Sequence, residues 1–214
     1  MGQKINPDFL NEIKNATNHA ILHPKKSQEE DSILEALGID EESILGMTLK
    51  YTAGISVYHG WVRLFGGESS EFTDSISDWN DINDSEQVFI EDALLVGYDL
   101  LGGFFAVNTG AFEDEDGMVY YFAPDTLLWE STELDYNDFF HWCLYGDIED
   151  YYKPYFWKSF AADCEVLKAN QGFQFDPPVY ELEEEDIDSL KRNVVSLRDL
   201  WELTTVEDEE IEED

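Results

Sequence analysis

Apolar residues recur every three or four positions along the first part of the chain, which is the spacing of helices that bury one face. The pattern predicts three helices, which begin at Asn6-Pro7, at Ser27–Glu30 and at Ser43. Proline at the first helical position loses no hydrogen bond, and a serine three residues before a glutamate forms a capping box. The third helix is expected to end near Gly54.

Beyond Gly54 the apolar positions alternate with polar ones, which indicates β-strands. Six short strands are predicted, at residues 55–58, 61–65, 93–98, 103–108, 118–122 and 127–130. Short strands joined by turns at this spacing are typical of a mainly antiparallel sheet. The polar stretch 68–87 has Trp79 as its main apolar residue and is predicted to be a surface loop.

Helical spacing returns after the predicted sheet. Residues 136–144 form one apolar helical pattern and residues 157–164 form another. Residues 173–180 are expected to be extended, at an edge or in a loop, because the pair Pro177-Pro178 cannot donate hydrogen bonds to a sheet. Ser196 can begin a final short helix.

These elements predict one α+β domain over residues 1–203, with N-terminal helices, a largely antiparallel central sheet and a helical segment after the sheet. Residues 204–214 are predicted to form an acidic, disordered tail. Apolar residues make up 43% and aromatic residues 14% of the 214 positions, so the chain can bury a sizeable core. A disordered acidic protein would lack this aromatic content.

The net negative charge restricts the kinds of molecule that this protein can bind. Forty-nine acidic residues against twelve basic ones give a formal net charge of -37. Such a surface repels phosphate backbones and anionic lipids, so we expect no direct nucleic-acid ligand and no membrane contact. A basic protein partner fits the charge, and so does an acidity that serves only solubility.

The cysteines and the N-terminus indicate a cytoplasmic protein. Cys143 and Cys164 lie within apolar helical patterns and are expected to be free, buried thiols rather than a disulfide. The N-terminal residues contain no apolar signal-peptide core. No apolar run approaches the roughly 20 residues that a membrane span needs.

No motif in the chain predicts a cofactor, a metal ion or a catalytic group. The four histidines keep no metal-binding spacing, and the acidic loops lack the spacing of a calcium loop. Paired carboxylates could serve glycoside hydrolysis, but so many acids make such pairs uninformative. The pair Gly102-Gly103 precedes a strand without a following lysine or helix, so close backbone packing or a bulge explains it better than a phosphate loop.

Several longer runs, in this order along nearly the whole chain, carry a family resemblance. They are Ala53-Gly54, His59-Gly60-Trp61-Val62-Arg63, LLGGFFAVN, YFAPDTLLWE, Tyr136–Trp142, Gly146-Asp147 and VSLRDLWEL. The chain is identified by these runs as a member of the bacterial domain-of-unknown-function family 2625. More distantly it resembles the SUKH superfamily of cell-wall regulators and immunity proteins. Many SUKH members have an acid after the glycine pair, where this chain has Phe104, so no residue role is transferred.

The SUKH resemblance implies non-catalytic protein binding, with neutralisation of a basic protein toxin as one form of it. An acidic surface would associate quickly with such a partner through electrostatic steering. Contact candidates on the two predicted acidic loops are Trp79, Asp81, Asp84, Asp114, Glu115 and Asp116. The alternatives are a small hydrolase or sugar-binding enzyme with carboxylates in a cleft, and a housekeeping domain without a recognisable site.

Overall fold

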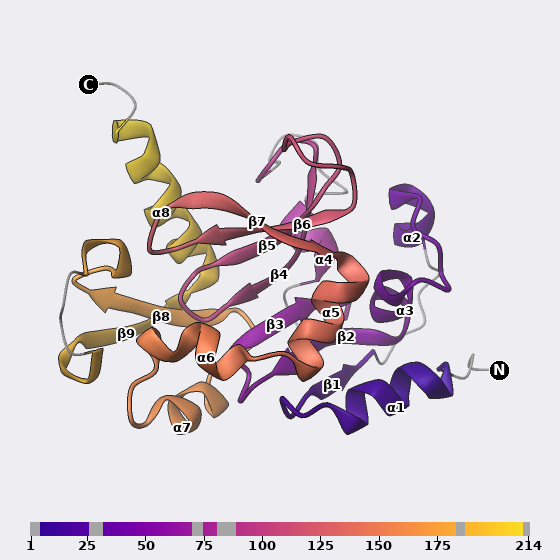
Figure 1. The fold of residues 1–214 in the computed structure, drawn as a ribbon, viewed down its shortest axis with the longest axis horizontal. Coiled ribbons are helices and arrows are strands. Elements are labelled where there is room, and N and C mark those ends of the chain that lie inside the picture. The colour runs from indigo at the N-terminus through magenta and orange to yellow at the C-terminus, as the bar shows by residue number, and fades with distance from the viewer. Residues whose placement is uncertain (1–4, 26–31, 70–74, 81–88, 183–186, 212–214) are drawn as a thin grey trace.

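A computed structural model describes residues 5–25, 32–69, 75–80, 89–182 and 187–211. Its centre is a seven-stranded sheet in which each strand pairs antiparallel with the next one along the chain, and a two-stranded sheet lies beside it (Figure 1). The predicted α+β class, with helices before and after a largely antiparallel sheet, is confirmed.

The strands of the main sheet follow the sequence order without a crossover. They are β1 (Ile21–Pro24), β2 (Thr52–Val57), β3 (Val62–Phe65), β4 (Ala93–Asp99), β5 (Phe104–Asn108), β6 (Met118–Ala123) and β7 (Leu128–Asp135). The smaller sheet contains β8 (Gln171–Asp176) and β9 (Lys191–Ser196). The six predicted strands are confirmed as β2 to β7, whereas β1 and β9 were not predicted.

One helix precedes β1, two lie between β1 and β2, one lies between β3 and β4, three follow β7, and one follows β9 in the described residues. They are α1 (Pro7–Asn15), α2 (Ser32–Leu37), α3 (Ile44–Tyr51), α4 (Ile76–Asn80), α5 (Tyr136–Tyr145), α6 (Ile148–Tyr152), α7 (Phe160–Glu165) and α8 (Leu197–Ile211). Single 3₁₀ turns are η1 (Lys153–Tyr155), η2 (Val179–Glu181) and η3 (Ile187–Ser189). The predicted caps are confirmed at Asn6, which accepts from the Asp8 N–H, and at Ser43, which accepts from the Gly46 N–H. The predicted capping box at 27–30 lies outside the described residues.

The predicted surface loop at 68–87 is wrong for Ile76–Asn80, which forms α4. Ser75 and Asp78 cap this helix reciprocally, since the Asp78 carboxylate accepts from the Ser75 N–H and the Ser75 hydroxyl oxygen accepts from the Asp78 N–H. The Asn80 side chain then exchanges two hydrogen bonds with the backbone of Leu95 in β4. These contacts hold α4 against the sheet and bury Trp79 completely.

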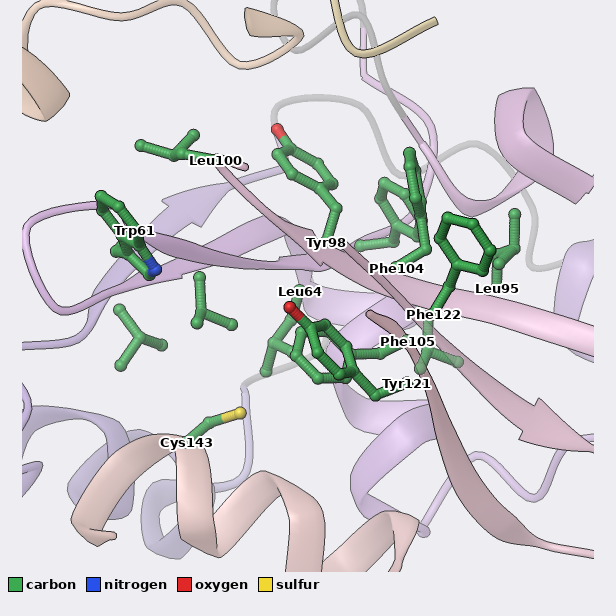
Figure 2. Close-up of a cluster of buried hydrophobic side chains, with 14 of the residues drawn as sticks. Trp61, Leu64, Leu95, Tyr98, Leu100, Phe104, Phe105, Tyr121, Phe122 and Cys143 are labelled. Atoms are coloured by element: carbon green, nitrogen blue, oxygen red, sulfur yellow. The ribbon is translucent and has the colours of Figure 1, made fainter. Parts of the chain in front are cut away.

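The main sheet is covered on both faces, so its core has two layers. On one face Phe105 lies 4.8 Å from Tyr121 and 4.7 Å from Phe139 of α5, measured between ring centroids. On the other face Phe104 lies 4.8 Å from Trp201 of α8. Figure 2 shows Phe104 on one side of the strands and Phe105 and Tyr121 on the side that faces α5. Aromatic residues supply most of the large side chains of this core, as the composition predicts.

Near the C-terminus, α8 runs from Leu197 to Ile211 and crosses residue 203. The Thr204 side chain is buried and donates to backbone carbonyls of its own helix. The division into a domain of residues 1–203 and a tail of residues 204–214 stays a prediction. Cys143 and Cys164 are free and buried, as predicted. In the described part of the chain, no helix has both the length and the apolar character needed to cross a bilayer.

Candidate functional site

The acidic loop, residues 109–117, connects β5 to β6 and is held by one buried amide. The Asn108 side chain donates to the carbonyl oxygens of Phe112 and Asp114, at 3.2 and 2.8 Å. Its Oδ1 accepts from the N–H groups of Gly110 and Phe112, both at 3.0 Å. One fully buried side chain therefore fixes the path of a loop whose acids are exposed.

Asp114 is the acid that this loop positions most firmly. Its Oδ2 accepts from the hydroxyl of Tyr120 at 2.7 Å and from that of Ser131 in β7 at 2.8 Å. These hydrogen bonds hold the pKa of the Asp114 carboxyl below its ordinary value, so it is charged at neutral pH. The bond to Ser131 also ties the loop to the edge strand β7.

The structure places the predicted contact residues in different environments. Asp114, Glu115 and Asp116 lie together and exposed on the acidic loop. Trp79 instead packs inside the core, with its ring centroid 5.0 Å from that of Phe104 and 5.9 Å from that of Phe65. Asp81 and Asp84 lie outside the described residues.

A second carboxylate, Asp99, is buried completely at the end of β4. Its Oδ1 accepts from the N–H groups of Leu101 and Gly103, at 2.8 and 3.0 Å. Its Oδ2 accepts from the hydroxyls of Tyr121 and Tyr152, at 2.6 and 2.9 Å. Burial raises the pKa of this carboxyl, and the four hydrogen bonds oppose the rise. Each oxygen has two donors, which fits a structural role and leaves no approach for a substrate.

Packing around Asp99 also explains the glycine pair Gly102-Gly103. Gly102 has φ +90°, a conformation that side chains rarely adopt, and a Cβ there would meet the Leu200 side chain. A Cβ at Gly103 would lie 2.4 Å from Asp99 Oδ2 and 2.5 Å from the Tyr121 side chain. The prediction that close packing explains Gly102-Gly103 is confirmed.

The Asp99 carboxyl should make the protein more stable as the pH falls. Because its pKa is higher in the folded chain, its contribution to the free energy of unfolding is largest below the ordinary pKa of 3.8 and is lost as the pH rises through the folded pKa. This one group gives a slope of at most about 1.4 kcal/mol per pH unit. Denaturant unfolding of wild type and Asp99→Asn across acid pH measures the slope, since asparagine does not titrate. Equal slopes for the two proteins would contradict the assignment.

An aromatic pocket of ≈ 300 Å³ lies between α5 and strands β5 to β7. Phe105, Tyr121, Trp142 and Tyr151 form its walls, and burial, followed by nearby Asp99, raises the pKa of Tyr151 to about 12. Glu130 is the one carboxylate among the described residues that line it. Glycoside hydrolysis by two carboxylates needs a second acid, which the lining of this pocket does not supply.

A larger pocket of ≈ 630 Å³ was not predicted, and we call it the basic pocket. Strands β1 to β3 form its floor, and the end of α1 and the segment after α7 form its walls. Its polar lining includes Lys14, His19, His23, Ser56, His59 and Arg63. His19 and His23 are four residues apart in the sequence, and the fold brings His59 to the same cavity. One sequence feature could have pointed to this pocket, namely the charged residue Arg63 within an otherwise apolar strand pattern.

Metal binding finds no support in the described residues. No group of three or more His, Cys, Asp or Glu side chains in them is arranged to hold an ion. His59 lies in a turn, as predicted, with φ +58°, and its Nδ1 lies 3.4 Å from Glu165 Oε1.

The fold and these sites define a class of protein, namely an α+β protein with a sequentially ordered antiparallel sheet that carries an organised acidic loop and a separate basic pocket. The chain belongs to the family described as "Protein of unknown function DUF2625", whose model matches residues 5–200. The predicted family membership is therefore confirmed, and the more distant SUKH likeness stays a prediction.

Two relatives extend the comparison. An "Uncharacterized protein" of Haemophilus influenzae is 31% identical over 186 residues, which cover 86% of this chain and 82% of the relative. The "Putative uncharacterized protein YbfG" of Escherichia coli K12 is 32% identical over 197 residues, which cover 92% of this chain and 88% of the relative. The chain is thus similar to these proteins over most of their length.

Proposed function

We propose that this protein is a non-catalytic binding protein whose partner is a basic protein held at the acidic loop and the neighbouring strand β7. The observation that carries the proposal is the distribution of charge along the chain. No Lys or Arg stands between Arg63 and Lys153, whereas acids are frequent there. Because the strands follow sequence order, this stretch occupies the β4 to β7 end of the sheet.

Hydrogen bonds from within the chain fix the acidic loop. Asn108 fixes its backbone, and Tyr120 and Ser131 fix the Asp114 carboxylate. A charged side chain that is already held in place loses little conformational entropy on binding. The entropy cost therefore cancels less of its attraction to a cation on the partner. The exposed side chains of Glu115 and Asp116 extend the same negative surface.

Strand β7 adds an open edge to this surface. It stands last in the strand order and pairs with β6 on one side, while Glu130, Glu133 and Asp135 are exposed. Acids on an edge strand discourage pairing with another copy of the chain and favour a partner that brings cations. A basic toxin that the protein neutralises is the specific partner we propose to test.

The test measures association with a basic partner captured at low salt, beginning with the product of any toxin gene next to this one. Glu115→Gln together with Asp116→Asn should slow association several-fold at low salt and change dissociation little, because steering acts on the approach. Surface plasmon resonance at several salt concentrations separates the two rates. The matched control, Glu35→Gln with Glu202→Gln, removes the same charge from exposed positions in α2 and α8.

Three outcomes would contradict the proposal. An equal loss of association rate in the control pair would mean that net charge matters rather than the acidic loop. A captured partner that is acidic, or binding that does not depend on salt, would also oppose it. Turnover of a small substrate at the aromatic pocket would favour the enzymatic alternative.

A further inference from the structure

Arg63 is a buried cation whose acceptors carry no charge. The residue is 6% exposed, and its side chain donates from Nε to the carbonyl of Gly60 at 3.1 Å and from Nη1 to the carbonyl of Lys168. Among the described residues, no carboxylate oxygen lies within the 4.0 Å of an ion pair with it. A guanidinium has five N–H donors, so part of its fork is left for another acceptor.

This arrangement is unexpected in a chain with four times as many acids as bases. Burying a charge without an opposite charge costs several kcal/mol, and carboxylates were abundant enough to supply one. The stretch that lacks Lys and Arg begins directly after Arg63. The position of this arginine therefore favours a counterion that comes from outside the chain.

The neighbouring side chains suit an anion. His23 Nε2 lies 2.7 Å from Ser56 Oγ on the adjacent strand. Burial, followed by the charge of Arg63, lowers the His23 pKa, so this imidazole offers a hydrogen bond rather than a positive charge. His19 and His59 reach the pocket from left-handed backbone positions, with φ +51° and +58°. Lys14 adds a charge at the exposed end of α1. Donors thus approach the cavity from several elements.

We propose that the basic pocket binds a small organic anion, whose carboxylate or phosphate group pairs with Arg63. The planar fork of arginine matches the oxygens of either group. The volume of ≈ 630 Å³ lies in the range of small-molecule sites. Ile13, Ala16, Ile21 and Leu167 give the rest of the lining an apolar character, so the ligand has a nonpolar body.

One acid also lines the pocket. Glu165 is exposed at 66% of its side chain and contacts His59 rather than Arg63. It therefore stands at the entrance, where water screens its repulsion of an anion. The proposed ligand group lies deeper, beside the buried guanidinium.

The test follows thermal unfolding of the full chain with sodium phosphate and, separately, with sodium acetate. Each is compared with sodium chloride at equal ionic strength, because any salt screens the negative surface and stabilises the fold. We expect a saturable rise in Tm with at least one of the two anions. A rise with phosphate alone assigns a phosphate ligand, and a rise with acetate alone assigns a carboxylate.

Variants locate the effect. Arg63→Gln should weaken the apparent affinity about tenfold or more, since it removes a charged hydrogen-bond donor. Lys14→Gln, at an exposed position that folding tolerates, should weaken it about two- to fivefold. Lys153→Gln removes the same charge from an exposed site outside the pocket and should leave the affinity unchanged.

The proposal is overturned if neither anion stabilises the wild type beyond chloride, or if folded Arg63→Gln keeps wild-type affinity. Should Arg63→Gln fail to fold, equal affinities of Lys14→Gln and Lys153→Gln overturn it instead. This site is independent of the acidic loop, so its failure would leave the proposed protein binding untouched.

Discussion

Replacing Asp99 with alanine is expected to lower the free energy of unfolding by about 3–5 kcal/mol. The change leaves the hydroxyls of Tyr121 and Tyr152 and two backbone N–H groups without their acceptor. An abandoned buried donor costs roughly 1–3 kcal/mol, and the release of a buried charge offsets part of the total. Denaturant unfolding followed by tryptophan fluorescence measures the loss.

The tyrosine variant Tyr152→Phe is the matched control for that prediction. It removes one donor and leaves the other donors to Asp99 in place, so we expect a loss of about 1 kcal/mol. The double variant should lose less than the sum of the single losses, because both changes remove the same hydrogen bond. An Asp99→Ala protein as stable as Tyr152→Phe would show that the carboxylate does not hold the β4–β5 connection.

Replacing Gly103 with alanine is expected to cost about 3 kcal/mol or more. The added Cβ would stand 2.4 Å from Asp99 Oδ2 and 2.5 Å from Tyr121. Neither neighbour is the free end of a flexible side chain, because the hydrogen bond between them fixes both. Relief of the clash therefore breaks the bonds to Asp99. The melting temperature and the denaturant midpoint should fall together.

Gly117→Ala separates this clash from backbone strain. Gly117 has φ +93° and nothing within 4 Å of an added Cβ, whereas Gly103 does not have a positive φ. We expect a cost of about 1 kcal/mol at Gly117, from the left-handed conformation alone. Similar losses at the two glycines would contradict the packing explanation.

Strands and helices were predictable where several consecutive residues showed the same apolar pattern between clear turn residues. The strands β2 to β7 show alternating or continuous apolar runs bounded by glycine and acidic turns, and all six were found. Strand β1 was missed because it is four residues long, contains Pro24 and has no alternation. Helix α4 was missed because polar residues on both sides concealed its Ser75 and Asp78 cap.

The sites were harder to predict because their residues meet only in the fold. The acidic loop is continuous in sequence, so Asp114 and its neighbours could be named. Trp79 was predicted to lie at the surface because its sequence neighbours are acidic, but tertiary packing buries it. The basic pocket draws on His23, Ser56 and Arg63 from three strands, and no local spacing joins them.

The strand order of the main sheet has an electrical consequence. Since sequence position becomes position across the sheet, the stretch between Arg63 and Lys153, which has many acids but no Lys or Arg, forms the β4 to β7 end of the sheet. The acids of the strands and their loops are therefore concentrated toward β7, in addition to the net charge of the whole chain. A basic protein approaching through water would be turned by this uneven negative field to meet β7 first.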